Sequence, residues 1–559
     1  MKTKTLTENV NSLSIRQQNN GLRCSDKAPE QCENEVNSVP RLMFGFFGDW
    51  ISYPASILSS LAIKKGWKVN LCYFAENLSE TEIIGYLEQD NPDLLALTLM
   101  TCDRGAAFKV AKLAKEREIK VVVGGIHAGI CPDDLIQTGF FDGVVRGDGM
   151  GVFEDILDGY KELKGEIIVG KGHPDISTYY DCYYSESQKN QIIKTKTLDT
   201  LSMLDCPLSC SFCATNTKPF IKLPIEAVAQ NIVDAHRNYG VEDIFFRDDL
   251  FTLSSERVRT FRQIVQKNGL DCEYHLHARG DRLNDEMLSE LKALGVEDMN
   301  IGIESLSDKI LNLLNKGVTA EQHYQMAERV ARYGMGLGIH LLFGLPTQDR
   351  EDYEKTLDFV RQVKPYRVLC HYFVPLPGTA LFQYCIDNGY LSADHSLDDY
   401  CLFIQANKPD FKGFREQTGF LSNVDYEMAV DYMKKTLDIH YEQVGNVILD
   451  AAEKADQESW IVVGAGDYFY RVLERLGQRK WKNLLGFYNY MDTESKGEGY
   501  LSHIFPHSIP EYRWLEDQAQ PKNILVTKHN GRVFRRVIEP LIRDEKGFSG
   551  QIFSAATLG

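Results

Sequence analysis

The sequence lacks long apolar runs and a cysteine framework. No stretch of about 18 apolar residues occurs in the 559-residue chain, so no membrane-spanning helix is expected. The N-terminal residues MKTKTLTENVNS have no apolar core, which argues against a secretory signal peptide. The 13 cysteines are odd in number and mostly scattered, so reduced thiols in a cytoplasmic protein are expected rather than disulfides.

An excess of positive charge is also missing. The chain has 62 lysines and arginines against 79 aspartates and glutamates, a formal net charge of −17. An acidic surface repels phosphate backbones, so nucleic acid is not an expected partner. Hydrophobic residues make up 43% and charged residues 25%, which is typical of a globular chain of several domains.

The first part of the chain alternates short apolar runs with amphipathic stretches. Residues 1–40 are polar and are predicted to form a flexible tail. In residues 41–165 the runs RLMFGFF, KVNLCYF, LLALTLM, KVVVGG and DGVVRG predict parallel strands covered by helices on both faces. This pattern is typical of a doubly wound, Rossmann-like α/β domain, whose ligands bind at the carboxyl ends of the strands.

The remaining chain predicts three further regions after a linker. Residues 166–198 are aperiodic and rich in tyrosine, and are predicted to be that linker. Residues 199–390 carry six strand–helix repeats, which favour a partial (β/α)6 barrel with its function at the strand carboxyl ends. Residues 391–456 have helical periodicity, and residues 457–559 predict a small Rossmann-like domain. The fold class is therefore α/β.

Three cysteines lie close together in the stretch LDCPLSCSFCATN: Cys206, Cys210 and Cys213. A structural zinc site needs four ligands, usually in two pairs. A C-x-x-C redox site would leave Cys206 unused. An iron–sulfur cubane usually takes four thiolates, so three would leave one iron open to a substrate or cofactor. The spacing favours this open-iron cluster over the other two sites.

These cysteines also carry a family resemblance. CPLSCSFC resembles the C-x-x-x-C-x-aromatic-C loop of radical S-adenosylmethionine (SAM) enzymes, and HARGD, GIHLLFGLP and FVPLPGT follow in that family's order. GGIHAGICPDD resembles the end of the N-terminal cobalamin-binding domain of one subgroup. The resemblance covers about residues 41–390. It implies a [4Fe–4S] cluster on the three cysteines, SAM on its open iron, and cobalamin in the first domain.

The resemblance also implies cofactor-binding residues in the barrel. Arg279 would pair with the methionine carboxylate of SAM, and Glu304 would hold its ribose or amino group. Alternative roles are a structural salt bridge for Arg279 and helix N-caps for Asp248 and Asp249. The predicted cofactor-binding set of the barrel is Asp248, Asp249, Arg279, Glu304, Gly344 and Pro377.

In the first domain, four residues are predicted to bind cobalamin. Gly124 and Gly125 would let the backbone approach the nucleotide tail, and Thr98 and Thr101 would bond the tail or line the lower face of the corrin. The alternative is that all four only form tight turns. The sequence has no complete D-x-H-x-x-G motif, so cobalt is expected to take no axial histidine from one.

Several features leave questions open. Asp205 stands where the family commonly has glycine; its carboxylate would either hinder cluster reduction or cap the loop. His275, His277, His340 and His371 lie on barrel strands and either face a substrate or are satisfied within the core or rim. The C-terminal stretch VVGAGDYF has phenylalanine where a dinucleotide site would have its third glycine, which disfavours nucleotide binding.

The resemblance implies an enzyme that methylates an unactivated carbon, or phosphorus, of a small molecule, lipid or peptide. Methylcobalamin would supply the methyl group, and a low-potential electron donor would start formation of the adenosyl radical. No catalytic side chain is predicted, because the cofactors carry the chemistry. The alternatives are a radical cyclase, rearrangement or oxidation enzyme in which cobalamin has another role or is absent, and a non-catalytic iron–sulfur redox sensor.

Overall fold

The computed structural model describes most of the chain from Val39 onward, so nearly all of the predicted tail lies outside it. The described residues are 39–47, 53–75, 78–175, 182–214, 220–392, 394, 396–397, 420, 425–464, 476, 480–489, 521–526 and 549–554. Contacts divide the chain into two units. Unit 1 runs to residue 174 and includes 392–420; unit 2 comprises 175–391 and the chain from 421 onward.

Unit 1 is built on a parallel six-stranded sheet of order β2-β1-β3-β4-β5-β6. Its strands are β1 Arg41–Phe46, β2 Lys68–Tyr73, β3 Leu94–Thr98, β4 Lys120–Gly124, β5 Gly143–Arg146 and β6 Glu166–Val169. The five predicted strands are present. The sixth strand, β6, lies in the segment predicted as a linker. Between β1 and β3 the strand order changes direction, which is where doubly wound sheets bind ligands.

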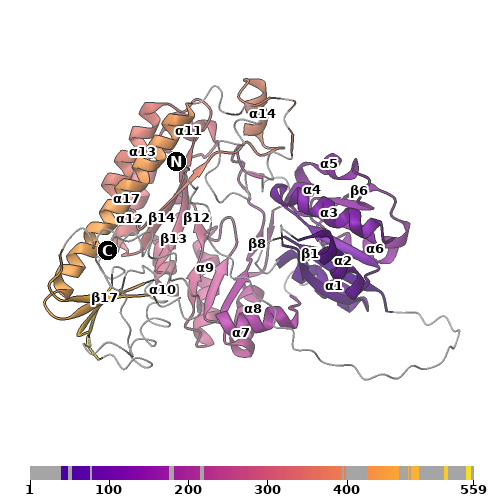
Figure 1. Ribbon diagram of the computed structural model, residues 1–559, viewed down its shortest axis with the longest axis horizontal. Helices are drawn as coiled ribbons and strands as arrows, with labels where there is room; N and C mark the ends of the chain where they lie inside the picture. The colour runs from indigo at the N-terminus through magenta and orange to yellow at the C-terminus, as the bar shows by residue number, and fades with distance from the viewer. Residues whose placement is uncertain are drawn as a thin grey trace, which may run out of the picture. The chain divides into compact units, whose positions relative to one another are not determined.

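The helices of unit 1 are α1 Tyr53–Lys64, α2 Glu80–Asp90, α3 Arg104–Lys115, α4 Ile126–Ile130, α5 Pro132–Ile136 and α6 Phe153–Gly159, with short 3-10 helices η1 Thr101–Asp103 and η2 Tyr160–Glu162 (Figure 1). Ser79 and Glu82 form a capping box that begins α2. Apolar residues of α3, such as Val110 and Ala114, are buried in the same core as strand residues Leu95 and Val121. Burial of both faces explains the nearly continuous apolar strands.

Unit 2 has six parallel strand positions in two sheets, of order β11-β10-β7 and β12-β13-β14-β15. The strands are β7 Thr197–Thr200, β10 Asp243–Phe246, β11 Glu273–His275, β12 His277–Ala278, β13 Asp298–Glu304, β14 Gly336–Phe343 and β15 Arg367–Tyr372. Leu276 interrupts the third position, but its carbonyl accepts a 3.3 Å hydrogen bond from Asn300 N. The six predicted repeats are thus present, with one strand broken in two.

The helices of unit 2 follow its strands along one face. They are α7 Glu186–Thr195, α8 Ile225–Tyr239, α9 Ser255–Lys267, α10 Asp285–Leu294, α11 Asp308–Leu313, α12 Ala320–Arg332, α13 Arg350–Val363 and α14 Ala380–Asp387, with the 3-10 helix η5 Gly280–Arg282. Helix α7 lies in the predicted linker. An antiparallel pair, β8 Met203–Leu204 with β9 Ile221–Lys222, flanks the cysteine segment. Figure 1 shows α11, α12 and α13 on the same side of β13 and β14.

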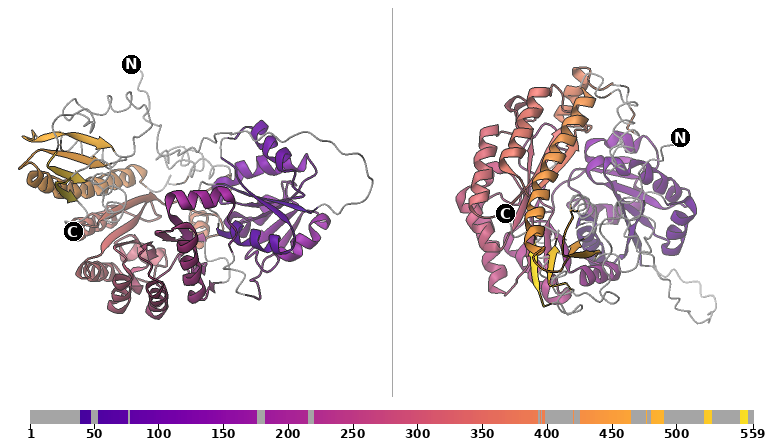
Figure 2. Two further views of the ribbon diagram at one scale, coloured as in Figure 1. Left: turned by 90° about the horizontal axis from the view of Figure 1, so that it is seen from below. Right: turned by 60° about the vertical axis from the view of Figure 1, so that its left-hand side comes forward.

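The last described elements are a long helix and a small sheet. Helix α17, Tyr426–Ala455, packs against α13 and also contacts β18 and β19 (Figure 2). The sheet has parallel order β17-β16-β18-β19, from β16 Trp460–Gly464, β17 Leu484–Asn489, β18 Asn523–Val526 and β19 Gln551–Ser554. Most of the glycine motif after Gly464 lies outside the described residues. Among the helices that the structure describes, none is long and apolar enough to cross a bilayer.

Candidate functional site

The three predicted cluster ligands share one loop directly after β8. Cys206, Cys210 and Cys213 are half-buried free thiols, and Cys213 N donates a 3.2 Å hydrogen bond to Cys210 O. Burial raises the pKa of Cys206, and the charges of Asp249, Cys213 and Cys210 raise it further. Positive charge nearby would favour ionisation of the Cys206 thiol, and an iron–sulfur core supplies such charge. The donor set therefore fits a cluster.

The cysteine loop is anchored by residues distant in sequence. Ser211 donates from its backbone N to Leu314 O at 2.9 Å and from Oγ to Leu313 O at 2.7 Å. Leu381 N, in the first turn of α14, donates to Ser211 O at 2.7 Å. Segments about 100 and 170 residues further along the chain thus hold the loop between Cys210 and Cys213. Such anchoring orders the ligand positions before any cofactor binds.

Asp205 adopts a left-handed backbone conformation, with φ of 60°. Glycine adopts this conformation without cost, and aspartate is among the few other residues that tolerate it. This explains why glycine suits the position before the first cysteine and why aspartate can replace it. The effect of the Asp205 carboxylate on cluster reduction stays a prediction.

Arg279 follows β12 and reaches the cysteine loop. Its Nη1 lies 3.4 Å from Cys210 Sγ, its Nη2 donates to Lys316 O at 2.5 Å, and its Nε donates to Asp281 Oδ1 at 2.9 Å. Only 9% of the residue is exposed. The guanidinium therefore places positive charge beside a ligand thiol while tying two segments together.

Glu304 ends β13 at a β-bulge, with φ of 67°. Its Oε1 lies 2.8 Å from Lys316 Nζ, and the two side chains are only 10% and 7% exposed. A Cβ at Gly302 would lie 2.4 Å from this oxygen, so glycine makes room for the carboxylate. Lys316 Nζ also lies 5.7 Å from the ring of Phe212, the aromatic residue of the cysteine loop. A buried ion pair thus borders the predicted cluster.

Lys316 was not predicted from the sequence. It occupies a polar turn after α11, where a lysine is usually solvated. Only the folded chain brings it to Glu304, twelve residues earlier. Nothing in the local pattern marks it, because its burial depends on long-range packing.

The two aspartates after β10 have different surroundings. Asp248 is buried, and its Oδ1 accepts hydrogen bonds from Ser202 N at 2.7 Å and Met203 N at 2.8 Å. Burial raises its pKa to about 7. Asp248 therefore supports β8, where the cysteine loop begins, and it is not a helix cap, because Ser254 caps α9. Asp249 is exposed, and its charge acts on Cys206.

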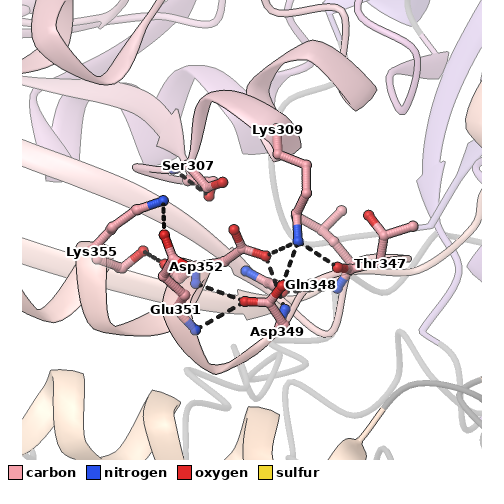
Figure 3. Close-up of polar contacts among 11 residues, drawn as sticks. Ser307, Lys309, Thr347, Gln348, Asp349, Glu351, Asp352 and Lys355 are labelled. Atoms are coloured by element: carbon pink, nitrogen blue, oxygen red, sulfur yellow. Dashed lines mark hydrogen bonds and ion pairs between the residues drawn. The ribbon is translucent and has the colours of Figure 1, made fainter.

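The loop after β14 is held by a network that Figure 3 shows. Gly344 and Thr347 both have positive φ, of 77° and 64°. Lys309, from α11, donates to Thr347 O at 2.9 Å and pairs with Asp349 at 2.7 Å and Asp352 at 2.6 Å. Asp349 and Asp352 also form the capping box of α13. The network fixes this loop at the carboxyl end of its strand, where the sequence predicted Gly344 as a cofactor-binding residue.

A second shaped turn follows β15. Pro377 is buried, Gly378 has φ of 78°, and Thr379 caps α14 by accepting from Phe382 N. These residues turn the chain from β15 into α14, whose first turn holds the cysteine loop. Pro377 is therefore connected to the candidate site through the backbone.

In unit 1 the predicted residues Thr98, Gly124 and Gly125 converge where β3 and β4 end side by side. Gly125 has φ of 98°, and a Cβ there would lie 2.6 Å from Leu99 O and 2.9 Å from Thr98 Oγ1. A Cβ at Gly124 would meet nothing within 4 Å. The turn therefore requires glycine only at position 125. It presents backbone at a strand end, which suits a polar cofactor tail.

Thr101 belongs to a buried network behind this turn. Its Oγ1 lies 3.2 Å from Nδ1 of His127, whose Nε2 lies 3.1 Å from Asp134 Oδ2. Arg104 donates two hydrogen bonds to the Asp134 carboxylate, from Nε at 2.6 Å and from Nη2 at 2.8 Å. Both ring nitrogens of His127 have protein partners. Sequence reasoning missed His127 and Asp134, whose pairing depends on the fold of 126–136.

Known family models match both regions that carry the predicted sites. The radical SAM superfamily model matches residues 201–360, and the B12 binding domain model matches residues 43–157. The chain therefore contains a radical SAM domain and a B12-binding domain. The three-cysteine loop lies within the first match and the Gly125 turn within the second.

Named relatives of this radical SAM enzyme include methyltransferases. It is 27% identical to an uncharacterised methyltransferase of Pyrococcus horikoshii over 57% of this chain and 74% of that protein. It is 25% identical to the hopanoid C-3 methylase of Methylococcus capsulatus over 54% of this chain and 62% of that protein. The chain thus spans less than two thirds of the hopanoid methylase.

A solved structure supports the fold. The radical SAM methyltransferase TsrM of Kitasatospora setae matches 63% of this chain and 75% of its own length, with a TM-score of 0.53 and 15% identity. The predicted family and α/β fold class are confirmed. The individual cofactor-binding residues stay predictions, now with the geometry given above.

Proposed function

We propose that this protein is a cobalamin-dependent radical SAM methyltransferase acting on an unactivated carbon, or phosphorus, of a small molecule, lipid or peptide. The carrying observation is that one chain holds a preorganised three-thiol loop and, in another domain, a glycine turn suited to a cofactor tail. Methyltransferase names among its relatives support the reaction type.

We propose that Cys206, Cys210 and Cys213 hold the [4Fe–4S] cluster. Two ion pairs, Glu304–Lys316 and Asp281–Arg279, place two negative and two positive groups near their loop. The amino-acid end of SAM is a zwitterion, so this charge set can orient both its amino and carboxylate groups. When bound, the cluster, SAM and cobalamin would supply one-electron chemistry and the methyl group. The chain's own role is to bind, orient and exclude water.

For cobalamin, we propose that Thr98, Gly124 and Gly125 contact the nucleotide tail. Thr101 would support the turn that these residues form, since its hydroxyl is hydrogen-bonded to His127. We also propose a low-potential one-electron donor as a partner. Nucleic acid is not a proposed partner, because the chain has a net charge of −17. The chemistry is proposed to occur in the cytoplasm, where the thiols stay reduced.

The first experiment is anaerobic reconstitution of the full chain with iron, sulfide and hydroxocobalamin, followed by desalting and an absorption spectrum. Retention of both cluster and cobalamin near one equivalent is expected, together with label transfer from methyl-labelled SAM once a substrate is supplied. The variant Cys210→Ala should lose the cluster and the cleavage of SAM. Cys182→Ser, at another half-buried cysteine, should retain both.

Two results would redirect the proposal. A cluster without retained cobalamin would remove methyl transfer and leave the cyclase, rearrangement or oxidation alternative. A cluster whose reduction never cleaves SAM would leave the redox sensor. The buried Glu304–Lys316 pair argues against the sensor, because a sensor has no need of a charged pocket beside its cluster.

A further inference from the structure

Three of the barrel histidines lie on one face of the sheet β12-β13-β14-β15. In the strand register, His277 on β12 lies beside Asn300 on β13, and Asn300 lies beside Gly338 on β14. His340 is two residues after Gly338 on the same strand. Leu342, two residues after His340, pairs with His371. Because side chains alternate along strands and paired residues share a face, all three imidazoles project from the same side. The alternate residues, such as Ile301 and Ile339, are fully buried on the other face.

This histidine face is continuous with the candidate cofactor site. Arg279 is two residues after His277, and its side chain reaches Cys210. Gly302 pairs with His340, and Glu304 lies two residues beyond Gly302. The charge of Glu304 acts on both His340 and His371. The rings therefore line the interior of the barrel next to the proposed radical chemistry. No described group of three His, Cys, Asp or Glu ligands that includes them converges closely enough to hold a metal ion.

His340 and His371 form a hydrogen-bonded pair. His340 Nδ1 lies 3.2 Å from His371 Nε2, and the rings are within 9° of parallel. Such a contact needs a hydrogen on one facing nitrogen and none on the other. Burial, then the charges of His371, His277 and Arg367, lower the pKa of His340 to about 4, although Glu304 raises it. Burial likewise lowers the pKa of His371 against Glu304. The pair is therefore neutral near pH 7.

The surroundings of His340 decide which ring donates. His340 Nε2 is buried and has no hydrogen-bond partner among the described residues. An N–H there would lack an acceptor, so the hydrogen of His340 is best placed on Nδ1, where His371 Nε2 accepts it. His371 then carries its own hydrogen on Nδ1. His371 is exposed, so the pair presents one N–H donor to the barrel interior.

We propose that His371, held in its Nδ1–H form by the positioning residue His340, donates a hydrogen bond to an uncharged oxygen of the substrate, a hydroxyl or carbonyl. The proposal rests on the proposed function, because it takes the barrel interior as the place of the substrate. A carboxylate or phosphonate is disfavoured as the partner of His371, because the neutral histidine pair offers it no positive charge.

The tautomer is tested by nitrogen NMR on the full-length, cluster-loaded protein labelled with [15N]histidine. Both His340 and His371 should show hydrogen on Nδ1. In His340→Leu the signal of His371 should become a mixture of tautomers, and in His340→Asn it should return to one, because the Asn amide can donate in place of Nδ1–H. A single unchanged tautomer in His340→Leu, or hydrogen on His371 Nε2 in the wild type, would overturn the proposal.

The ligand class is tested in the same samples with N-methylacetamide, an uncharged carbonyl probe, and acetate as its anionic counterpart. N-methylacetamide should shift the His371 signal, with about fivefold weaker binding in His340→Leu and recovery in His340→Asn. His236, whose Nδ1 bonds Val241 O at 2.6 Å, is the internal control and should not shift. A shift of His371 by acetate alone would overturn the ligand class.

Two further outcomes separate this proposal from the function on which it rests. If SAM alone shifts His371 and excludes N-methylacetamide, the ring belongs to the cofactor site and the substrate assignment is wrong. If the wild-type protein reacts with dithionite and SAM without forming 5′-deoxyadenosine, the proposed function fails, whatever the NMR result.

Discussion

The central sheets of the two units bury their strands differently. In unit 1, β3 is buried at its first four positions, and β4 is buried throughout its middle. In unit 2, β13 alternates between buried and half-buried residues; the half-buried face carries Asn300 and Gly302, and the buried Glu304 follows the bulge. A strand covered on both faces leaves only its end for a ligand. A strand covered on one face leaves a whole surface for chemistry.

This difference explains where each unit keeps its polar groups. Unit 1 places them in turns, where Gly125 lets backbones approach and the His127 network lies behind. Unit 2 places them along strands and buries an ion pair, Glu304–Lys316, inside the barrel. Changes in unit 1 should therefore act through backbone shape, and changes in unit 2 through charge.

The largest expected effect is loss of charge balance in unit 2. Glu304→Gln leaves Lys316 buried without its counter-charge, which should destabilise the unit by about 3–5 kcal/mol. Urea unfolding of the full-length protein measures it. The double variant Glu304→Leu/Lys316→Met should be much less destabilised, because no charge stays buried.

Glu351, in the exposed pair Glu351–Lys355, is the matched control. Glu351→Gln should cost less than about 1 kcal/mol. Equal losses for Glu304→Gln and Glu351→Gln would contradict the importance of buried charge in unit 2, because they would show that the buried pair contributes no more than a surface one.

The next effect tests backbone shape in unit 1. Gly125→Ala forces a Cβ to within 2.6 Å of Leu99 O at φ of 98°, a conformation that is essentially restricted to glycine. It should destabilise the turn by about 1–3 kcal/mol and reduce retained hydroxocobalamin, measured by absorbance after desalting. Gly124→Ala, with open space around its Cβ, should leave the stability of the turn unchanged. A normal cobalamin content in Gly125→Ala would show that the turn does not shape the cofactor site.

A smaller effect concerns pH in unit 2. Burial raises the pKa of Asp248 to about 7. Because the folded protein holds this proton and the unfolded chain does not above about pH 4, stability falls as pH rises from about 4 to 7. Asp248→Asn keeps an acceptor for Ser202 N and Met203 N and should flatten that slope in melting temperatures. An unchanged slope would mean that Asp248 is ionised in the folded protein.

The smallest effect has the opposite sign and lies in unit 1. Burial alone would raise the pKa of Asp134, but hydrogen bonds from His127 and Arg104 hold it at about 2. This lowered pKa contributes stability above about pH 4 that is lost as pH falls towards 2. Asp134→Asn should remove that acid-side loss from melting curves of unit 1. If Asp134→Asn still loses stability as pH falls, other carboxylates cause that loss.

Much of the fold followed from the sequence because it depends on local pattern. Apolar strands at regular spacing predicted both α/β units, and the cysteine spacing predicted the loop of Cys206, Cys210 and Cys213. The segment 166–198 was predicted as a linker because it is aperiodic and rich in tyrosine, yet β6 and α7 form there. β6 gains its stability by pairing with β5, a neighbour that local composition does not reveal.

The candidate site was predictable only in part. Glu304 was expected from its place at a strand end, whereas Lys316 was not, since a lysine in a polar turn is usually exposed. Asp248 was expected to contact a cofactor or cap a helix, but it binds the backbone of Ser202 and Met203. Each miss concerns a partner that lies far along the chain.

The sequence by itself determined the type of chemistry and the class of fold. Thiol spacing and strand periodicity are local properties, and they are written in consecutive residues. Only the tertiary structure decided that Glu304 pairs with Lys316, that Asp205 takes a left-handed backbone, and that His340 meets His371. These contacts depend on strand register, bulges and loop closure, and those are set by the packing of the whole unit rather than by neighbouring residues.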